Sequence, residues 1–556
     1  MSSNSEKTLI KCILKSSDPA FPSVEIGSEK VYIGRNRDCR IQSIQCSKKQ
    51  ISAKISVLSN GETVLFLNRM GTNPSSLNGQ EMKFFIAYEA KDGDKLEPVK
   101  DLGLFYTVEI KDENGKTENV KTPDIEKLNS DAGKRRSSTE LIQNDTKKIR
   151  TTQENVSPNS SQSKTSSLPC PDDKWDEIDG GKLYIFTSKG VQHGPKIAGY
   201  DIDGTIIKTK SGNVFPKNID DWQIAFSQVP GKLKSLHKDG YKIVFFTNQA
   251  GISSGKLKIT EFRKKVERII SKLNIPVQVF ISTGKGKYRK PILGMWETLE
   301  KKANGNFTID LSESFYCGDA AGRPEKKGPS KRKKDFSCSD RLFAMNIGVK
   351  FYTPEENFQN AKQDKDWTQP GFDPKTFNSN SSMTLTNPPD ALKKPVNQEV
   401  IVMVGMPASG KSSFARKHFE TSGYAYINRD SLGSWQKCVS ALEKAVQENK
   451  NAVIDNTNPD AESRKRYIEV AKKRKIPCRC FIMATTEAQA KHNNVFRELT
   501  DPFHSVIKDM VFHGYKSKFQ EPSLKEGFTE IVKVNCIPQF DDPEKEKLYK
   551  MYLVEK

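Results

Sequence analysis

The sequence predicts a multidomain protein in which an N-terminal β-sandwich precedes two α/β domains. The chain has 556 residues, whereas single hydrophobic cores stop growing at ~250 to 300 residues. Short alternating strands fill the first part of the chain, and apolar strands alternate with amphipathic helices in the rest. Two polar stretches of low hydrophobicity separate these regions, so we expect three folded domains joined by linkers.

Each region has its own pattern. Residues 1–110 hold short runs such as KVYIG, AKISVL, TVLFLN and LFYTVEI between Asn, Gly and Asp, which is typical of a small β-sandwich. Residues 111–180 are rich in Ser, Thr, Asn and Lys, which predicts a disordered linker. Residues 181–365 contain the strands IAGYDID, KIVFFTN, VQVFIST and SFYCGD. A linker over 366–397 precedes a second α/β domain over 398–556, with strands EVIVMVG, YAYINRD, NAVIDNT and PCRCFIMA.

Cysteine usage and apolar runs bound the class of protein. The 10 cysteines are scattered, without a Cys-x-x-Cys pair, and Cys478 and Cys480 lie too close together for a zinc knuckle. This pattern favours reduced thiols in an intracellular protein. No apolar run reaches the length of a signal peptide core or a membrane span, so we expect a soluble protein.

The basic excess is confined to one part of the chain. The formal net charge is +21, but residues 1–180 hold equal numbers of basic and acidic side chains. The whole excess therefore belongs to residues 181–556, where it would attract a polyanion such as nucleic acid. A solvated lysine surface is the alternative interpretation.

GMPASGKS, at Gly405–Ser412, follows an apolar strand and opens a helix, which is the setting of a P-loop. Backbone amides of such a loop cradle nucleotide phosphates, Lys411 would reach the terminal phosphates, and Ser412 would hold Mg²⁺. The predicted ATP-binding residues are Gly405, Ser409, Gly410, Lys411, Ser412 and Ser413.

The acceptor of a P-loop kinase needs a base. Asp430 ends the next strand, at the sheet edge where ligands bind, and its carboxylate can accept the proton of an attacking hydroxyl. The alternative is that Asp430 caps a helix beginning at Ser431. The segment 455–459, DNTNP, would supply metal or substrate contacts, or only a turn. Arg497, on an expected lid helix, would neutralise transition-state charge, or be a surface arginine.

YDIDGT, at Tyr200–Thr205, ends a strand with two carboxylates two residues apart. Asp201 would attack phosphorus and form an aspartyl phosphate, while Asp203 would shuttle protons to the leaving oxygen. Gly204 permits the sharp turn.

This motif resembles the haloacid-dehalogenase phosphatase superfamily, and its other motifs follow in order. The resemblance implies that Thr247 holds phosphate oxygens and that Lys290 screens the nucleophile. It also implies a Mg²⁺ site made by Asp201, Asp203 and Asp319. Taken singly, each of these residues has an ordinary structural explanation. Asp340 is a further acidic candidate that either ligates the metal or only holds Lys290.

Loops of the first domain, YIGRNRD, CSKKQISAKI and MGTNPSSLNG, resemble a forkhead-associated domain, which reads phosphothreonine. The resemblance implies that Arg35 and Ser47 hold the phosphate, that Lys48 adds charge and that Asn73 fixes the peptide backbone. Gln45 stands where the family tends to be basic, and Lys48 replaces the more usual arginine, so phosphate affinity is expected to be reduced.

Together the motifs resemble the polynucleotide kinase 3′-phosphatase family, through GMPASGKSSFA, INRDSLGSWQKC, HNNVFRE, YDIDGTIIKTKSG, FFTNQAGI and CGDAAGRP. The resemblance implies a monomeric DNA end-healing enzyme that uses ATP and Mg²⁺, removes 3′-phosphate, phosphorylates 5′-hydroxyl ends and binds phosphorylated repair scaffolds. Two alternatives stay open. One is an RNA end-healing enzyme of the same chemistry, and the other is a phosphopeptide-reading scaffold with degenerate enzyme domains.

Two basic clusters in the first linker, KRR at 134–136 and KKIR at 147–150, flank a polar spacer. They fit a bipartite nuclear import signal, although a solvated charge run has the same composition. We therefore expect residence in the nucleus. A third cluster, KRKK at 331–334, is a candidate DNA-contacting loop.

Overall fold

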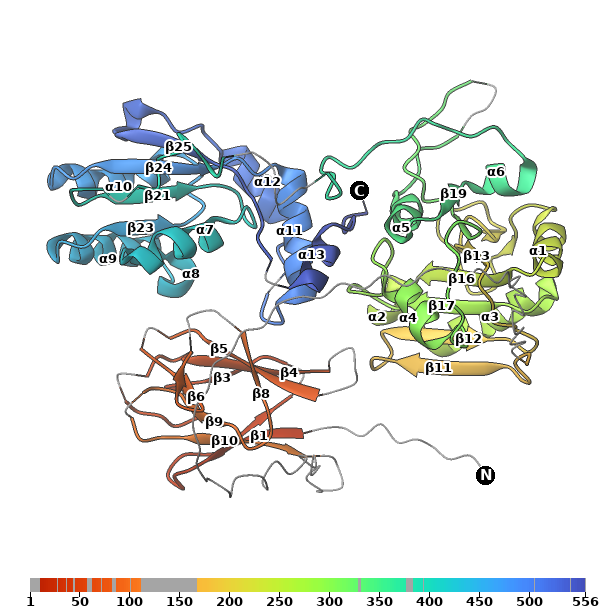
Figure 1. Cartoon of the computed structure of the whole chain (residues 1–556), viewed down its shortest axis with the longest axis horizontal. Helices are drawn as coiled ribbons and strands as arrows, with labels where there is room; N and C mark the ends of the chain where they lie inside the picture. Colours follow the sequence, from red (N-terminus) through yellow and green to blue (C-terminus); the bar gives the residue numbers. More distant parts are fainter. Residues whose placement is uncertain are drawn as a thin grey trace, which may run out of the picture.

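The computed structural model describes residues 11–111 and 168–555, apart from 28, 37, 44–45, 58–62, 72, 83–86, 101, 329–331, 377–383, 394, 505 and 541. Gln45, both basic clusters of the first linker and Lys331 lie outside the described residues. Figure 1 shows three lobes, one made by each predicted folded region. Among the helices of the described ranges, none is both long and apolar enough to cross a membrane.

The N-terminal lobe is a β-sandwich, as predicted (Figure 1). Alternation of buried and exposed residues along its strands places Leu14, Ile33, Ile51, Leu65 and Tyr106 in one core between two sheets. The strand order of one sheet is β2 (Val24–Ile26), β1 (Lys11–Ser16), β10 (Tyr106–Lys111), β9 (Lys95–Glu97), β6 (Ser76–Leu77) and β7 (Gln80–Glu81), and that of the other is β3 (Val31–Ile33), β4 (Ile51–Val57), β5 (Thr63–Arg69) and β8 (Ala87–Ala90).

The second lobe is built on a seven-stranded sheet. Its strand order is β11 (Lys174–Ile178), β12 (Leu183–Thr187), β17 (Gln278–Ser282), β16 (Lys242–Asn248), β13 (Ile197–Tyr200), β18 (Phe315–Cys317) and β19 (Lys350–Tyr352), and β14 (Ile207–Lys208) and β15 (Gln223–Ile224) form a separate hairpin. The strands from β17 to β19 in this order pair in parallel. The fully buried, continuously apolar strand β13 is typical of a parallel sheet covered on both faces.

Helices cover both faces of this sheet. On one face Phe262 and Val266 of α3 pack against Phe245, and on the other Trp296 of α4 packs against Phe246. The helices are α1 (Val229–Lys238), α2 (Ala250–Ser253), α3 (Ile259–Leu273), α4 (Gly294–Lys302), α5 (Ser339–Ile347) and α6 (Pro354–Gln359). The predicted α/β domain is thus a doubly covered sheet, with its loops gathered at the carboxyl edge of the parallel strands.

The third lobe has a six-stranded sheet. Its strand order is β20 (Thr386–Asn387), β25 (Glu530–Val534), β24 (Cys478–Met483), β21 (Val400–Val404), β23 (Ala452–Asp455) and β22 (Ala425–Asn428). The covering helices are α7 (Lys411–His418), α8 (Arg429–Leu432), α9 (Trp435–Gln447), α10 (Ala461–Lys473), α11 (Glu487–Thr500), α12 (Asp509–Lys518) and α13 (Pro543–Tyr549), with 3₁₀ turns at Glu420–Ser422 and Leu524–Glu526. Cores fill both faces of the sheet.

Three domain limits differ from those that composition suggests. Strand β11, KWDEI, lies in the predicted first linker but forms the edge of the second sheet, where its charged residues face solvent. Strand β20 lies in the predicted second linker and pairs with β25. Residues 551–555, assigned by sequence to the last domain, pack against the second lobe (Figure 1).

Lys242, at the start of β16, is a buried lysine that forms no ion pair with the carboxylates that the structure describes. It is 4% exposed, and its Nζ lies 2.6 Å from the Ala303 carbonyl oxygen and 3.1 Å from His193 Nδ1. Burial lowers the pKa of Lys242 to about 7. Between pH 7 and the unfolded value near ~10.4, the unfolded chain binds more protons than the native chain, so this group makes stability rise with pH.

We expect Lys242→Met to remove that rise. Between pH 7 and pH 10, the free energy of unfolding of the wild type should increase by about 2 to 4 kcal/mol relative to that of the variant. Urea unfolding followed by tryptophan fluorescence at several pH values measures this difference. Lys234→Met, at an exposed position of α1, is the control and should leave the pH dependence unchanged. Parallel pH profiles for the wild type and Lys242→Met would show that Lys242 stays charged in the native state.

Candidate active sites

The first site lies at the carboxyl edge of the parallel strands of the second lobe. Asp201 directly follows β13, Thr247 is the next-to-last residue of β16, and Asp319 lies two residues after the end of β18. Gly204 has φ +88°, and a Cβ atom there would lie 2.3 Å from Asp319 Oδ2. Glycine is therefore required at this position for both the turn and the close approach of the two loops.

Lys290 is the centre of this site. Its Nζ is 2.6 Å from Asp201 Oδ1, 2.7 Å from Asp340 Oδ1, 2.8 Å from the Phe246 carbonyl oxygen and 2.9 Å from the Tyr316 hydroxyl oxygen. Burial acts to lower the pKa of Lys290, but Asp201 and Asp340 outweigh it and hold that pKa above its ordinary value. The lysine is therefore a fixed positive charge beside the predicted nucleophile, and Asp340 holds it there.

Three carboxylates form a group that fits a divalent cation. Asp201, Asp319 and Asp340 each offer an oxygen, and these atoms lie within 4.8 Å of one another. Burial, together with the neighbouring carboxylates, raises the pKa of Asp319, so a positive charge is needed to ionise the whole group. Carboxylate oxygens at a partly closed site match the ligand preference of Mg²⁺.

Asp203, predicted as both proton shuttle and metal ligand, is held by residues outside the three-carboxylate group. Its Oδ2 accepts a hydrogen bond from Gln249 Nε2 at 2.7 Å, and its Oδ1 pairs with Lys265 Nζ at 3.1 Å. Gln249 Nε2 also donates to Thr247 Oγ1 at 2.9 Å. The Asp203 carboxylate thus stands outside the three-carboxylate group and beside the predicted phosphate-binding threonine, a position that suits proton transfer better than metal ligation.

The second site is the P-loop of the third lobe. The loop follows β21, and α7 begins at Lys411, directly after Gly410 with φ +95°. Lys411 Nζ donates to the Met406 carbonyl oxygen at 2.7 Å, and burial lowers the pKa of Lys411 to about 8. Asp455 and Asp430 oppose that shift, so both carboxylates lie within electrostatic range of the lysine that would reach the nucleotide phosphates.

Asp430 does not cap the helix on which it lies. Helix α8 is capped by Asn428, whose Oδ1 accepts from the backbone N–H groups of Asp430 at 2.8 Å and Ser431 at 3.3 Å. The Asp430 side chain is exposed, and Asn428 Nδ2 contacts the buried Asp455 at 3.1 Å. The capping alternative is therefore wrong, and the carboxylate is available to a substrate hydroxyl.

Helix α11 brings Arg497 toward the P-loop. Asn493 Nδ2 donates to the Ala408 carbonyl oxygen of the loop at 3.0 Å, and Arg497 lies four residues later on the same helix face. The Arg497 guanidinium is half exposed and pairs with Asp501 at 3.4 Å, an i,i+4 pair that contributes little. This weak pair leaves the guanidinium free to exchange Asp501 for a phosphate.

The same side of the third lobe carries an aromatic residue that sequence patterns did not indicate. Trp435 opens α9, a few residues after Asp430, and is 36% exposed. The Arg466 guanidinium lies 4.3 Å from its ring centroid. A nucleobase could stack on the flat ring of such a tryptophan, and the neighbouring guanidinium could attract a phosphate group.

The predicted phosphopeptide site gathers on the loops of the sandwich. The backbone N–H of Arg35 donates to the Ser47 carbonyl oxygen at 2.9 Å, and Arg35 Nε donates to the Cys46 carbonyl oxygen at 3.2 Å. Gln50 accepts from the Ser47 N–H and donates to the Asn73 carbonyl oxygen at 2.7 Å. The buried Gln50, which sequence patterns did not indicate, therefore joins the Arg35, Ser47 and Asn73 loops, while Lys48 is exposed beside them.

Family models match the chain in three places: FHA domain at residues 12–83, Polynucleotide kinase 3 phosphatase at 196–358 and AAA domain at 400–522. The chain is 38% identical over 365 residues to a bifunctional polynucleotide phosphatase/kinase of Schizosaccharomyces pombe, covering 65% of this chain and 85% of the relative. It is 31% identical over 220 residues to a polynucleotide 3′-phosphatase of Saccharomyces cerevisiae, covering 30% of this chain and 89% of the relative.

One solved structure, the FHA domain of human APLF in complex with an XRCC1 bisphospho peptide, is similar to part of the chain. It shares 18% sequence identity and covers 18% of this chain and 97% of that chain, with a TM-score of 0.15.

Proposed function

The chain belongs to the bifunctional polynucleotide phosphatase/kinase family, and we propose that it heals broken DNA ends by removing 3′-phosphate and phosphorylating 5′-hydroxyl groups. The observation that carries the proposal is the presence of two separate phosphoryl-transfer sites, one around Lys290 and one around Lys411. The grouping of Asp201 and Asp319 around Lys290, and of Asp430 and Asp455 within electrostatic range of Lys411, supports activity at both sites.

In the phosphatase, Asp201 attacks phosphorus and the bond to the 3′ oxygen breaks as that oxygen takes a proton from Asp203. A water molecule then gives its proton to Asp203 and hydrolyses the aspartyl phosphate, releasing inorganic phosphate. Lys290 offsets the charge of Asp201 as the dianionic phosphate approaches. Mg²⁺, when bound by Asp201, Asp319 and Asp340, would supply further neutralisation of the phosphate.

In the kinase, the oxygen of the 5′ hydroxyl attacks the γ-phosphorus of ATP while Asp430 accepts the hydroxyl proton. The bond between the γ-phosphorus and ADP breaks. Lys411 and the loop amides hold the phosphates, and Ser412 would hold Mg²⁺. Arg497 approaches from α11 to neutralise the charge that develops on the transferred group.

The loop of the β14–β15 hairpin, which follows Asp201 and Asp203 in the chain, supports a polynucleotide rather than a small phosphate ester as substrate. Val214 and Phe215 are 71% and 72% exposed in the segment after β14. The Asp221 carboxylate holds that segment by accepting hydrogen bonds from the backbone N–H groups of Ser211 and Lys217. An exposed aromatic ring on a pinned loop can stack on a nucleobase.

We therefore expect Phe215→Ala to lower kcat/KM for a 3′-phosphorylated oligonucleotide by roughly 10-fold, a loss equivalent to one base stack. Hydrolysis of p-nitrophenyl phosphate should not change, because that ester has no base to stack. Steady-state kinetics of both substrates measure the difference. An equal effect on the two substrates would place Phe215 outside the nucleic-acid path.

The N-terminal domain would recruit the enzyme to phosphorylated, acidic segments of repair scaffold proteins, and the chain would act in the nucleus as a monomer. The Arg35, Ser47 and Asn73 loops held together by Gln50 support the first point. The proposal of nuclear localisation rests on the two basic clusters of the first linker.

Arg35→Ala is expected to abolish binding of a phosphothreonine peptide while leaving both activities on free oligonucleotides unchanged. The guanidinium makes a charge-assisted contact to phosphate, and neither catalytic site uses it. Fluorescence anisotropy with phosphorylated and unphosphorylated forms of one peptide checks the effect. Arg40→Ala, an exposed arginine on the same loop, is the control. Retained phosphopeptide binding in Arg35→Ala would remove the reader role.

The class of nucleic acid is tested with matched DNA and RNA oligonucleotides that carry 3′-phosphate or 5′-hydroxyl. We expect higher kcat/KM with DNA for both reactions. Preference for RNA in both reactions would make the chain an RNA end-healing enzyme, and absence of turnover on either would leave only the scaffold function.

A further inference from the structure

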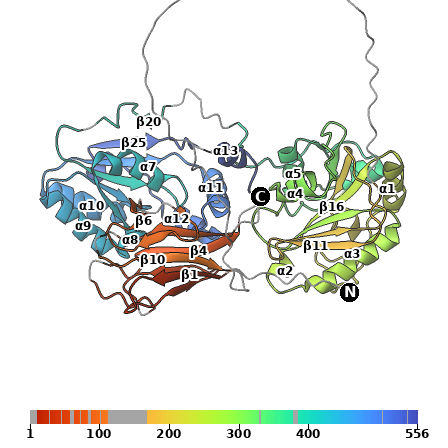
Figure 2. The same cartoon turned by 60° about the horizontal axis from the view of Figure 1, so that its bottom comes forward.

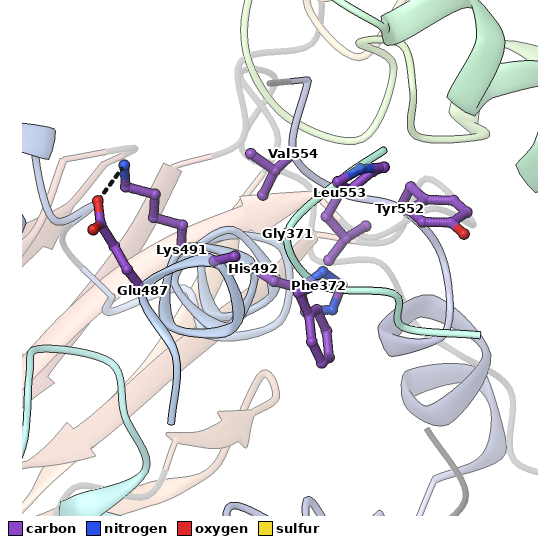
Figure 3. A pocket seen from close by; sticks show the side chains of 10 residues that line it. Gly371, Phe372, Glu487, Lys491, His492, Tyr552, Leu553 and Val554 are labelled. Atoms are coloured by element: carbon purple, nitrogen blue, oxygen red, sulfur yellow. Dashed lines mark ion pairs between the residues drawn. The ribbon is translucent and has the colours of Figure 1, made fainter. Parts of the chain in front are cut away.

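The segment 551–555, here called the C-terminal strap, follows α13 of the kinase domain but packs against the phosphatase domain (Figure 1 and Figure 2). Met551 and Leu553, 8% and 3% exposed, join the core that contains Trp296 and Phe343. Figure 3 shows Tyr552, Leu553 and Val554 passing beside Phe372 and kinase helix α11, which carries His492. The strap therefore lies between the two catalytic domains, next to a cavity of about 260 Å³.

The polar contacts of the strap with the phosphatase fall on two short stretches of that domain, and one further contact, from the Tyr552 hydroxyl to Asp373 Oδ1 at 2.8 Å, lies outside them. Asn346 of α5 forms two hydrogen bonds with the Tyr552 backbone, both at 2.9 Å. Asn346 Nδ2 donates to the Tyr552 carbonyl oxygen, and Asn346 Oδ1 accepts from the Tyr552 N–H. Asn346 Nδ2 also donates to the Pro291 carbonyl oxygen at 2.9 Å. One amide thus joins the strap to the residue that directly follows Lys290.

Glu555 joins the same two stretches. Its carboxylate accepts from Arg289 Nη2 at 3.1 Å and from Arg289 Nε, and its carbonyl oxygen accepts from the Cys338 N–H at 3.0 Å. Arg289 directly precedes Lys290, and Cys338 lies two residues before Asp340. A bidentate guanidinium–carboxylate pair fixes both distance and orientation.

These contacts meet around the ion pair at the base of the phosphatase site. Lys290 and Asp340 are 2% and 1% exposed and lie 2.7 Å apart, and Lys290 must also stay 2.6 Å from Asp201. The strap holds the chain on either side of Lys290 and the start of α5, which positions Asp340. A displacement of ~1 Å in such a site can cost about 10²-fold in rate.

We propose that the C-terminal strap of the kinase domain positions the phosphatase, with Glu555 as a positioning residue that aligns Lys290 and Asp340 through Arg289 and Cys338. The inference rests on the proposed phosphatase activity and adds a dependence of that activity on residues of the kinase domain. The phosphatase site would be complete only when the strap is docked, whereas the kinase site would not depend on the strap.

The test compares full-length Glu555→Ala, Glu555→Gln and a chain ending at Lys550 with the wild type. Glu546→Ala is the matched control, because Glu546 pairs with Lys550 on the surface of α13 at 2.7 Å. Phosphatase kcat should fall roughly 10-fold in Glu555→Ala and about 10²-fold in the shortened chain, with KM for the oligonucleotide nearly unchanged. Glu555→Gln, which keeps a hydrogen-bond acceptor, should recover part of the rate, and kinase kcat should be unchanged throughout.

Normal phosphatase kcat in the shortened chain would overturn the proposal. Parallel loss of both activities together with the melting temperature would also overturn it, because the strap would then serve only folding. Absence of phosphatase activity in the wild type would instead refute the proposed function, so the two failures are distinguishable.

Discussion

Asp201→Asn should lower removal of 3′-phosphate by roughly 10⁴- to 10⁶-fold, because the amide cannot form the covalent intermediate. The 5′-kinase rate should stay within about twofold of the wild type, since Lys411 and Asp430 lie in a different domain with its own sheet. The measurement is single-turnover kinetics of both reactions on one preparation. Asparagine keeps the shape of the side chain but no longer pairs with Lys290 as an anion.

Asp239→Asn, an exposed carboxylate at the end of α1, is the control for the first prediction and should change neither rate. Melting curves show whether Asp201→Asn remains folded. Equal loss of both activities in a folded Asp201→Asn protein would contradict two independent sites.

Asp430→Asn should lower phosphorylation of the 5′ hydroxyl by about 10² to 10⁴-fold while ATP affinity is retained. Lys411 and the loop amides are the expected nucleotide contacts, so binding and chemistry should separate. The melting temperature should also be unchanged, because Asn428 rather than Asp430 caps α8. ATP titration, thermal melting and single-turnover phosphorylation of the same preparation measure all three.

Asn428→Ala is the complementary variant for the second prediction. Loss of the cap is expected to destabilise the kinase domain by about 1 kcal/mol. A near-normal phosphorylation rate in Asp430→Asn would remove the general-base role, whatever the behaviour of Asn428→Ala.

The catalytic residues that end strands could be predicted because parallel strands place consecutive motifs at one sheet edge. Asp201, Asp319 and Asp430 all follow such strands. Apart from Asp340, the residues that position them could not be predicted. Lys265, for example, reaches Asp203 from 62 residues away, and nothing in the helical pattern around it distinguishes it from a surface lysine.

The remaining differences also have physical causes. Strand β11 is charged because it lies at a sheet edge, so its composition resembles the linker beside it. Gln50 is buried among turn residues whose hydrogen bonds depend on loops brought together only by the sandwich. The sequence assigns the C-terminal strap to the end of the kinase domain. Only the structure shows that the apolar residues of the strap complete the phosphatase core.

A nicked duplex with 3′-phosphate and 5′-hydroxyl at one break tests the central claim most directly, since one substrate then requires both sites of one chain. With ATP and Mg²⁺, the wild type should yield 3′-hydroxyl and 5′-phosphate, and the break should become ligatable. Asp201→Asn should yield only the 5′-phosphate, Asp430→Asn only the 3′-hydroxyl, and a mixture of the two variants should restore both. If the wild type leaves either end unchanged, or either variant loses both products, the account of two independent sites is contradicted.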